Sequence, residues 1–207
     1  MTDRDQQAAP AGWSPADAED RQAMIRLVTG QGAALNELME RHAEKLFHYL
    51  LRALQDEQDA ADLAQEAFTR VYQNAVRYDP RQKFSTWLYA IASNLVRDRY
   101  RWRRRHPQVS LNAPNEASGE EFAAEMPDNS RPALETLLGR ERAAEVRQAV
   151  AELPEFLRIP LLLAEYEEKP HAEIAVILGC STKAVEKRVY RARCELRERL
   201  HHLLAAT

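Results

Sequence analysis

The sequence predicts an all-α protein made of two small helical domains joined by a flexible acidic linker. Three observations support this fold class. Only six of the 207 residues are glycine, and long stretches are rich in Ala, Leu, Arg and Glu, which favour helices. Apolar residues recur at three- and four-residue intervals along most of the chain, as one buried helical face requires. Residues 106–133 interrupt this pattern with prolines and acids.

Charge and hydropathy exclude several classes of protein. The chain carries 29 basic and 32 acidic residues, for a formal net charge of −3, but the arginines and the acids gather in different segments. It has no run of about 18 apolar residues that could span a membrane. The N-terminus has no apolar segment typical of a secretory signal. Cys180 and Cys194 lack CxxC spacing, which favours reduced thiols, so we expect a cytoplasmic protein without membrane insertion.

The first domain is predicted to cover residues 19–105, after a disordered polar tail at 1–18. A short helix over about 19–29 ends at Gly30, and a longer helix follows over about 33–54. The residues expected to face inward are Met24, Ile25 and Val28 in the short helix, and Leu35, Leu38, Met39, His42, Leu46, Leu50 and Leu54 in the long one.

A third helix is predicted over 57–76. Its buried face would consist of Leu63, Ala67, Phe68, Val71 and Tyr72, and the polar residues outside that face include Asp59, Asp62, Gln65 and Glu66. Acids in the first half of a helix complement its dipole, which is a purely structural interpretation. The functional alternative is an acidic docking surface for a partner protein. Pro80 then ends the helical region, because a residue that precedes proline disfavours the helical conformation.

The fourth helix, over 84–105, has an apolar face and a basic, aromatic face. The apolar residues at helical spacing are Phe84, Trp87, Leu88, Ile91, Ala92 and Leu95. From Arg97 to Arg105 six arginines stand against a single acid, and Tyr100 and Trp102 lie among them. One interpretation is a solvated helix end that complements the dipole. The alternative is a nucleic-acid-binding face, since arginines hold phosphates and aromatic rings stack on bases.

Residues 106–133 differ from the segments on both sides. Between Arg105 and Arg131 there is no lysine or arginine, whereas five acids and several prolines are present. A stretch of this length without an apolar pattern is unusual inside a compact domain, so it predicts a flexible acidic linker. The second domain would then cover 134–207 and begin with helices over about 134–152 and 155–167.

The stretch 173–199 predicts a helix-turn-helix. A short apolar helix is stopped by Gly179, and Ser181 or Thr182 can cap a second, basic helix. Glycine permits the tight turn, and the small Ala175 lets the two helices approach closely. The outer face of the second helix would carry Lys183, Glu186, Lys187, Tyr190 and Arg191, close to the end that such helices insert into the major groove. A generic pair of antiparallel helices is the structural alternative.

Taken in order, these segments resemble a bacterial RNA polymerase sigma factor of the sigma-70 family, extracytoplasmic-function (ECF) group. The resemblance extends over most of residues 20–203 and rests on DLAQEAFTRVYQNA (62–75), FSTWLYAIASNLVRDRYRWRRR (84–105), LPEFLRIPLLL (153–163) and EIAVILGCSTKAVEKRVYRAR (173–193). It implies a sigma-2-like four-helix bundle at 19–105 and a sigma-4-like helix-turn-helix domain at 134–207. The implied function is to bind core RNA polymerase and to direct promoter-specific initiation at −10 and −35 elements.

The resemblance also implies partners and site residues. The −10 element would be recognised and melted by Tyr78, Asp79, Asn94, Arg97, Tyr100, Arg101 and Arg104. The −35 element would be read by Lys183, Glu186, Lys187, Tyr190 and Arg191. Docking on the β′ clamp helices of core polymerase would use Asp59, Asp62, Gln65 and Glu66, and the β flap and an anti-sigma factor are further candidate partners. Glu186 stands where the family often has Lys or Arg, so the −35 preference stays open.

No motif in the sequence indicates an enzyme. It contains no P-loop, no GxSxG, no HExxH and no paired-cysteine metal cluster. We therefore expect no catalytic activity, cofactor, metal or small-molecule substrate. The alternative function is a free-standing, dimeric helix-turn-helix transcriptional regulator. That alternative leaves the arginine-rich end of the first domain unexplained, and no extra dimerisation helix is evident.

Overall fold

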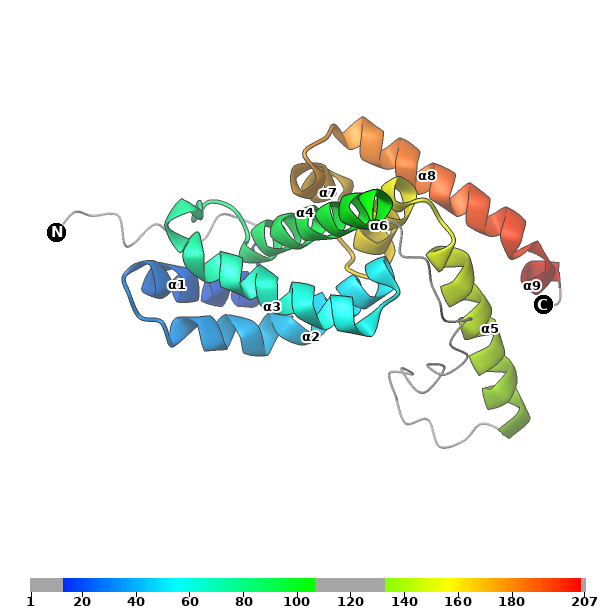
Figure 1. Ribbon diagram of the computed structural model, residues 1–207, viewed down its shortest axis with the longest axis horizontal. Helices are drawn as coiled ribbons and strands as arrows, with labels where there is room; N and C mark the ends of the chain where they lie inside the picture. Colours follow the sequence, from blue (N-terminus) through cyan, green and yellow to red (C-terminus); the bar gives the residue numbers. More distant parts are fainter. Residues whose placement is uncertain (1–12, 107–132, 206–207) are drawn as a thin grey trace.

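The computed structural model describes residues 13–106 and 133–205, and every regular element within these two ranges is a helix. In chain order the elements are α1 (Pro15–Val28), α2 (Ala34–Leu54), α3 (Glu57–Gln73), the short 3-10 helix η1 (Ala75–Arg77), α4 (Phe84–Arg105), α5 (Ala133–Ala151), α6 (Glu155–Glu165), α7 (His171–Leu178), α8 (Thr182–Arg199) and α9 (His201–Ala205). Helices α1–α4 form one bundle and α6–α8 a second, with α4 where the two meet, and α5 extends away from α6–α8 (Figure 1). The predicted all-α fold with two helical domains is confirmed.

The first bundle is built around α2, which packs against α1, α3 and α4. Leu50 of α2 and Phe84 and Leu88 of α4 are fully buried. The buried hydroxyl groups of Tyr49 and Ser93 lie 2.9 Å apart and satisfy each other, as polar groups inside a core require. These contacts fix the orientation of α4 about its own axis, and therefore decide which of its side chains face outward.

Helix α1 begins at Pro15, so the predicted disordered tail over 1–18 is too long. The Ser14 Oγ accepts a hydrogen bond from the Asp17 N–H at 3.1 Å, and the Asp17 carboxylate accepts one from the Ser14 N–H at 2.9 Å. This reciprocal capping box, followed by proline at the first helical position, defines the start of the helix. Residues 1–12 lie outside the described part of the chain.

The second bundle is organised by α6, which is buried from Leu157 to Leu163. Pro160 lies in the interior of α6 rather than in its first turn, and it removes one helical hydrogen bond there. Helix α7 ends at Gly179, whose φ of +62° is a left-handed conformation that glycine adopts without strain. Ser181 caps α8 by accepting a hydrogen bond from the Ala184 N–H at 3.2 Å. The predicted helix-turn-helix is therefore present.

The two bundles pack against each other, which the sequence did not indicate. Helix α4 contacts α7, helix α2 contacts α6, and the buried apolar residues of both bundles form one connected cluster. Most of the predicted linker falls in residues 107–132, which lie outside the described part of the chain. Helix α4 is thus shared between two environments, the core of its own bundle on one side and the second bundle on another (Figure 1).

Candidate nucleic-acid interface

Helix α8 presents all of its predicted contact residues on one open side. Its buried residues are Val185, Val189 and Ala192, and the exposed set comprises Lys183, Glu186, Lys187, Tyr190 and Arg191. The Tyr190 side chain is 71% exposed. Arg191 pairs with Glu195 at 3.3 Å within the same helix and lies over the Phe156 ring. The basic side of α8 is therefore free to approach a duplex.

The predicted contact residues of α4 divide between two sides of the helix. One side, the outer ridge, consists of the exposed residues Asn94, Asp98, Arg101, Trp102 and Arg105. The other side, the inner face, faces the second bundle and consists of Thr86, Tyr89, Arg97, Tyr100 and Arg104. The structure therefore brings Asn94 and Arg101 to one surface, and it places Arg97, Tyr100 and Arg104 on another.

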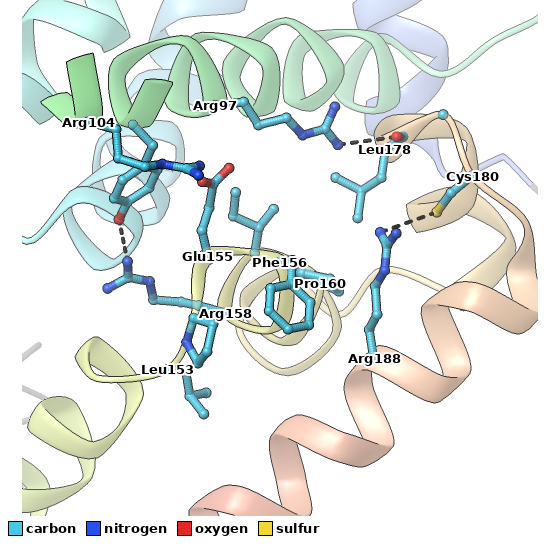
Figure 2. Close-up of a pocket in the computed structure, with 14 residues that line it drawn as sticks. Arg97, Arg104, Leu153, Glu155, Phe156, Arg158, Pro160, Leu178, Cys180 and Arg188 are labelled. Atoms are coloured by element: carbon cyan, nitrogen blue, oxygen red, sulfur yellow. Dashed lines mark hydrogen bonds between the residues drawn. The ribbon is translucent and has the colours of Figure 1, made fainter. Parts of the chain in front are cut away.

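A cleft of about 760 Å³ lies between the inner face of α4 and helices α6, α7 and α8. At one edge Arg97 Nη2 donates to the Leu178 carbonyl oxygen at 3.2 Å (Figure 2). At the other edge the buried Arg158 donates to the Tyr100 hydroxyl, which itself donates to the Ala53 carbonyl oxygen. Of the predicted strand-binding residues of the inner face, Arg97 and Tyr100 are thus engaged within the chain, whereas Arg104 lines the cleft and is exposed.

The charge of this cleft is mostly positive. Four arginines line it together with one carboxylate: Arg97, Arg104, Arg158, Arg188 and Glu155 (Figure 2). Partial burial raises the pKa of Glu155, although the neighbouring arginines act in the opposite direction. The Arg188 guanidinium contacts the Cys180 sulfur at 3.8 Å. An excess of guanidinium groups makes the cleft attractive to an anionic segment.

The loop before α4 holds Tyr78 and Asp79 in different environments. Tyr78 is only 7% exposed, its ring lies 5.4 Å from that of Trp87, and its hydroxyl donates to the Gln82 carbonyl oxygen at 2.6 Å. Burial raises the pKa of Tyr78, so the hydroxyl keeps its proton. Asp79 is exposed, and hydrogen bonds from Arg81 lower the pKa of its carboxyl group. Asp79 thus lies at the surface in an ion pair with Arg81, whereas Tyr78 supports the loop from within.

The acidic side chains of α3 also lie in two different environments, some exposed to solvent and one paired with α4. Asp62 and Gln65 are exposed, and Glu66 is half-exposed and accepts a hydrogen bond from Arg70 at 2.8 Å. The Asp59 carboxylate instead accepts hydrogen bonds from two α4 arginines, Arg99 and Arg103, the latter at 2.6 Å. Its side chain is only 13% exposed. The sequence predicts Asp59 on the outer surface of α3, but in the structure its carboxylate is directed at α4, where it neutralises part of the basic helix end.

Trp102 belongs to the outer ridge but was missing from the predicted site. Its ring is 41% exposed and stacks on His106 with the ring centroids 4.8 Å apart. The other aromatic side chains of α4 are engaged: Trp87 packs on Tyr78, Tyr89 is 4% exposed, and Tyr100 is bonded to Ala53. In the sequence, a tryptophan flanked by arginines indicates a residue that can stack on a base. Spacing alone does not distinguish Trp102 from the other aromatic residues of α4, whereas its exposure in the structure does.

Two further properties of the described residues bear on the site. Within 13–106 and 133–205 no three His, Cys, Asp or Glu side chains gather as metal ligands would. In the same ranges no helix has the length and apolar character needed to cross a bilayer. The described surface features that stand out are accordingly the basic face of α8 and the basic end of α4.

A helix-turn-helix with an open basic face, packed beside a bundle that ends in an arginine-rich helix, defines a two-domain DNA-binding protein. Family models support this class and make it specific: "Sigma-70 region 2" matches residues 38–106 and "Sigma-70, region 4" matches residues 143–196. The chain is 32% identical over 186 residues to the RNA polymerase sigma-H factor of Pseudomonas aeruginosa, covering 90% of this chain and 96% of that protein. It is 32% identical over 178 residues to the ECF RNA polymerase sigma factor SigW of Bacillus subtilis, covering 84% and 92% of the two chains.

Solved structures agree with these relatives. CnrH, in complex with the cytosolic domain of CnrY, is 26% identical and aligns with a TM-score of 0.62 over 91% of this chain and 98% of its own. The sigma factor RpoE of Bartonella quintana, in complex with the anti-sigma factor NepR, shares the fold at 20% identity, with a TM-score of 0.60 over 80% of this chain and 96% of its own.

The chain belongs to the ECF group of the sigma-70 family of RNA polymerase sigma factors. It acts as a sigma factor in transcription initiation.

Proposed function

We propose that the second bundle reads the −35 duplex through α8. The observation that carries this assignment is the open side of α8, where every predicted contact residue is exposed. Lys183, Lys187 and Arg191 would hold phosphates and fix the register of the helix, while Glu186 and Tyr190 meet base edges. A carboxylate accepts a hydrogen bond from cytosine N4, so Glu186 favours a cytosine at the base pair it faces.

The −10 element is assigned to α4 and to the loop before it. The outer ridge offers arginines for phosphates and Trp102 for stacking, and Asp79 is an exposed acid of the loop. Flipping a base out of the duplex costs a few kcal/mol, and stacking on an aromatic ring returns about 1–3 kcal/mol per base. Arg97, Tyr100 and Arg104 join this surface once the second bundle moves away.

Two protein partners complete the proposal. Asp62, Gln65 and Glu66 on α3 form the exposed polar surface that would dock on the β′ clamp helices of core polymerase, and the second bundle would meet the β flap. Asp59 supports that surface indirectly by holding α4 in place. CnrH was solved with CnrY and RpoE with the anti-sigma factor NepR, so an anti-sigma factor is the second protein partner proposed for this chain. The protein would do this work in the cytoplasm and without catalysis.

Promoter geometry shows what the proposed function demands of the fold. The two elements are centred about 25 base pairs apart, which is roughly 85 Å of duplex at about 3.4 Å per base pair. In the structure Arg97 of α4 lies 3.2 Å from the Leu178 carbonyl oxygen, directly before the turn that leads into α8. The two reading surfaces are therefore too close together to reach both elements at once, and the bundles must separate on the promoter.

Run-off transcription with core polymerase on a random-promoter library tests this function. We expect the selected promoters to share a −10 and a −35 element, and the free protein to bind duplex DNA only weakly. A tight, sequence-specific footprint in the absence of polymerase would contradict the proposal and favour a free-standing regulator. A stable dimer in light scattering would point the same way, since such regulators bind two half-sites as dimers.

A further inference from the structure

We propose that the cleft lined by α4, α6, α7 and α8 is a binding site for a small molecule, a nucleoside diphosphate. Arginines of the cleft wall and the first turn of α6 would hold its phosphate groups, and its base would stack on Phe156. The site goes beyond the proposed function, because it involves neither DNA nor polymerase. Four features of the cleft, namely its charge, its free donors, its size and an exposed aromatic ring, carry the proposal.

The charge of the cleft wall suits a ligand with several negative charges. Four arginines from three different helices line it, namely Arg97 and Arg104 of α4, Arg158 of α6 and Arg188 of α8. Figure 2 shows these side chains around one open space. Among the described residues that line the cleft, Glu155 is the only acid, so the wall has an excess of three positive charges. A nucleoside diphosphate carries about three negative charges at neutral pH and would balance that excess.

Two of these arginines keep donors for a ligand although they already make hydrogen bonds. Arg97 donates from Nη1 to Asn94 Oδ1 at 3.1 Å and from Nη2 to the Leu178 carbonyl oxygen at 3.2 Å. A guanidinium group has five N–H donors, so further donors remain. Arg188 donates to the Cys180 sulfur at 3.8 Å, and sulfur is a weak acceptor that a phosphate oxygen would displace. Paired guanidinium donors match the spacing of phosphate oxygens.

Arg158 places a fixed positive charge in the wall of the cleft. The residue is only 6% exposed. Its two terminal nitrogens donate to the Ala151 carbonyl oxygen at 2.7 Å and to the Tyr100 hydroxyl. Its Nε has no hydrogen-bond partner among the described residues, and a buried donor without an acceptor is destabilising. Arg158 therefore combines a position set by two bonds with a donor that is still unsatisfied.

The first turn of α6 adds backbone donors to those of the arginines. Pro154, Glu155 and Phe156 all line the cleft. Pro154 is the N-cap residue and makes no side-chain hydrogen bond to the turn, so the first N–H groups of α6 have no side-chain acceptor from the cap. The N-terminal end of a helix attracts anions through such N–H groups and through the helix dipole. Phosphate oxygens in the cleft would thus meet backbone donors and guanidinium groups together.

The size of the cleft and one aromatic side chain favour a nucleotide over free phosphate. The volume of about 760 Å³ lies within the range of about 300–1,000 Å³ that is usual for small-molecule sites, and phosphate groups alone would leave most of it empty. Phe156 lines the cleft and is 51% exposed. An exposed phenyl ring beside a phosphate-binding wall offers a stacking surface for a base.

Isothermal titration calorimetry of the full chain with ADP, GDP and inorganic pyrophosphate tests the proposal. The cleft variant, Arg104→Gln/Arg188→Gln, is compared with Arg101→Gln/Arg193→Gln. The control arginines lie on the same two helices, α4 and α8, but do not line the cleft, and both variants lose two positive charges. Circular dichroism shows whether each variant is folded. A low-salt buffer without divalent cations keeps the charges of the ligand and the cleft unscreened.

We expect the wild type and the control to bind ADP or GDP with micromolar affinity, and the cleft variant to bind at least about tenfold more weakly, because two charged contacts are lost. Glu155→Gln should bind about threefold more tightly, since it removes the acid that repels the phosphates. A wild type that binds neither nucleotide would overturn the proposal, as would equal affinities for the cleft variant and its control.

Phe156→Leu distinguishes a nucleotide from a phosphate group alone. The exposed ring is lost while the arginines stay, so affinity for ADP or GDP should fall about tenfold and affinity for pyrophosphate should stay the same. Pyrophosphate that binds the wild type as tightly as both nucleotides do would overturn the assignment to a nucleotide. The titrations contain no polymerase and no promoter, so their failure would leave the proposed function in transcription initiation intact.

Discussion

Helices α8 and α4 carry the two predicted DNA-reading surfaces, and they differ in how much of each surface is open. All five predicted contact residues of α8 are exposed. On α4 the outer ridge is exposed, but Arg97 and Tyr100 are bonded to the second bundle. The difference follows from where the neighbours of each helix lie, not from how many there are. Helix α8 packs through one side only, whereas α4 contributes to its own core and also carries the second bundle.

Under the proposed function, this difference would give the two helices separate roles in initiation. The element proposed to read duplex DNA is ready in the free protein, while the element proposed to hold an opened strand is partly covered. A strand-binding surface that stays covered until the protein reaches polymerase would limit binding to unrelated single-stranded nucleic acid, which arginines and aromatic rings attract without regard to sequence. The following experiments test this difference, beginning with the largest expected effect.

Removing one arginine from each side of α4 should give the largest loss. For Arg97→Ala/Arg101→Ala we expect open-complex formation to fall about 30- to 100-fold, about 2–3 kcal/mol, because two charged strand contacts disappear. Binding to core polymerase should be unchanged, since neither residue lies on α3. Arg193→Ala/Arg199→Ala, which removes two arginines paired within the second bundle, is the matched control. An equal fall in core binding would show that the basic end of α4 has been misassigned.

Substitution of Trp102 tests the role of the outer ridge without changing the inner face of α4. Trp102→Ala should reduce open-complex formation about tenfold, because stacking of a base on an aromatic ring contributes about 1–3 kcal/mol. Permanganate footprinting of the melted region measures the effect. Trp102→Phe keeps a stacking surface and should retain most of the activity. If Trp102→Ala melts the promoter as well as the wild type does, the exposed tryptophan has no part in strand binding.

Glu186 tests the sequence preference of α8. In Glu186→Ala we expect the preference for cytosine at one −35 position to relax about fivefold, about 1 kcal/mol, because the carboxylate no longer accepts a hydrogen bond from cytosine N4. Run-off transcription on promoters that differ at each −35 base pair gives the ratio. Lys183→Ala should instead weaken all promoters alike, as the loss of a phosphate contact does. A base preference unchanged in Glu186→Ala would remove this residue from direct readout.

Ser181 concerns the stability of α8 and should give the smallest effect. Ser181→Ala removes the cap of the helix and should cost about 0.5–1 kcal/mol of unfolding free energy, which lowers the thermal midpoint by a few degrees. Ser14→Ala removes the corresponding cap of α1 and serves as the control. Both variants should have a slightly lower thermal midpoint of unfolding, but only Ser181→Ala should weaken use of the −35 element. An unchanged −35 response would mean that α8 keeps its N-terminal geometry without this cap.

Much of the fold could be predicted because helical periodicity is a local property. The stop at Gly179 follows from residue type alone, and residue types limit the cap of α8 to Ser181 or Thr182, of which the structure has Ser181. The prediction failed at the margins of helical faces, where Val28, Met39 and Tyr72 were expected inside but are 44%, 37% and 58% exposed. A residue at the edge of an apolar face is buried only if a neighbouring helix reaches it, which periodicity does not report.

The site could be predicted only in part, for a related reason. The open side of α8 follows from its own amphipathic pattern. The covering of α4 depends on contacts such as that between Thr86 and Glu173, which are 87 residues apart in sequence. The pairing of Asp59 with Arg99 is equally non-local. Without a sequence signal for how the two bundles pack, residue type and spacing could not separate covered arginines from open ones.

The two bundles belong to one chain, and this determines how their packing against each other would respond to the amount of protein in the cell. A tether of moderate length holds its two ends at an effective local concentration in the millimolar range, so contacts too weak to join separate molecules suffice within one chain. Such an equilibrium does not change with expression level, unlike the formation of a dimer. A cell that makes few or many copies of this sigma factor would keep the same fraction of them closed, and only a binding partner would change that fraction.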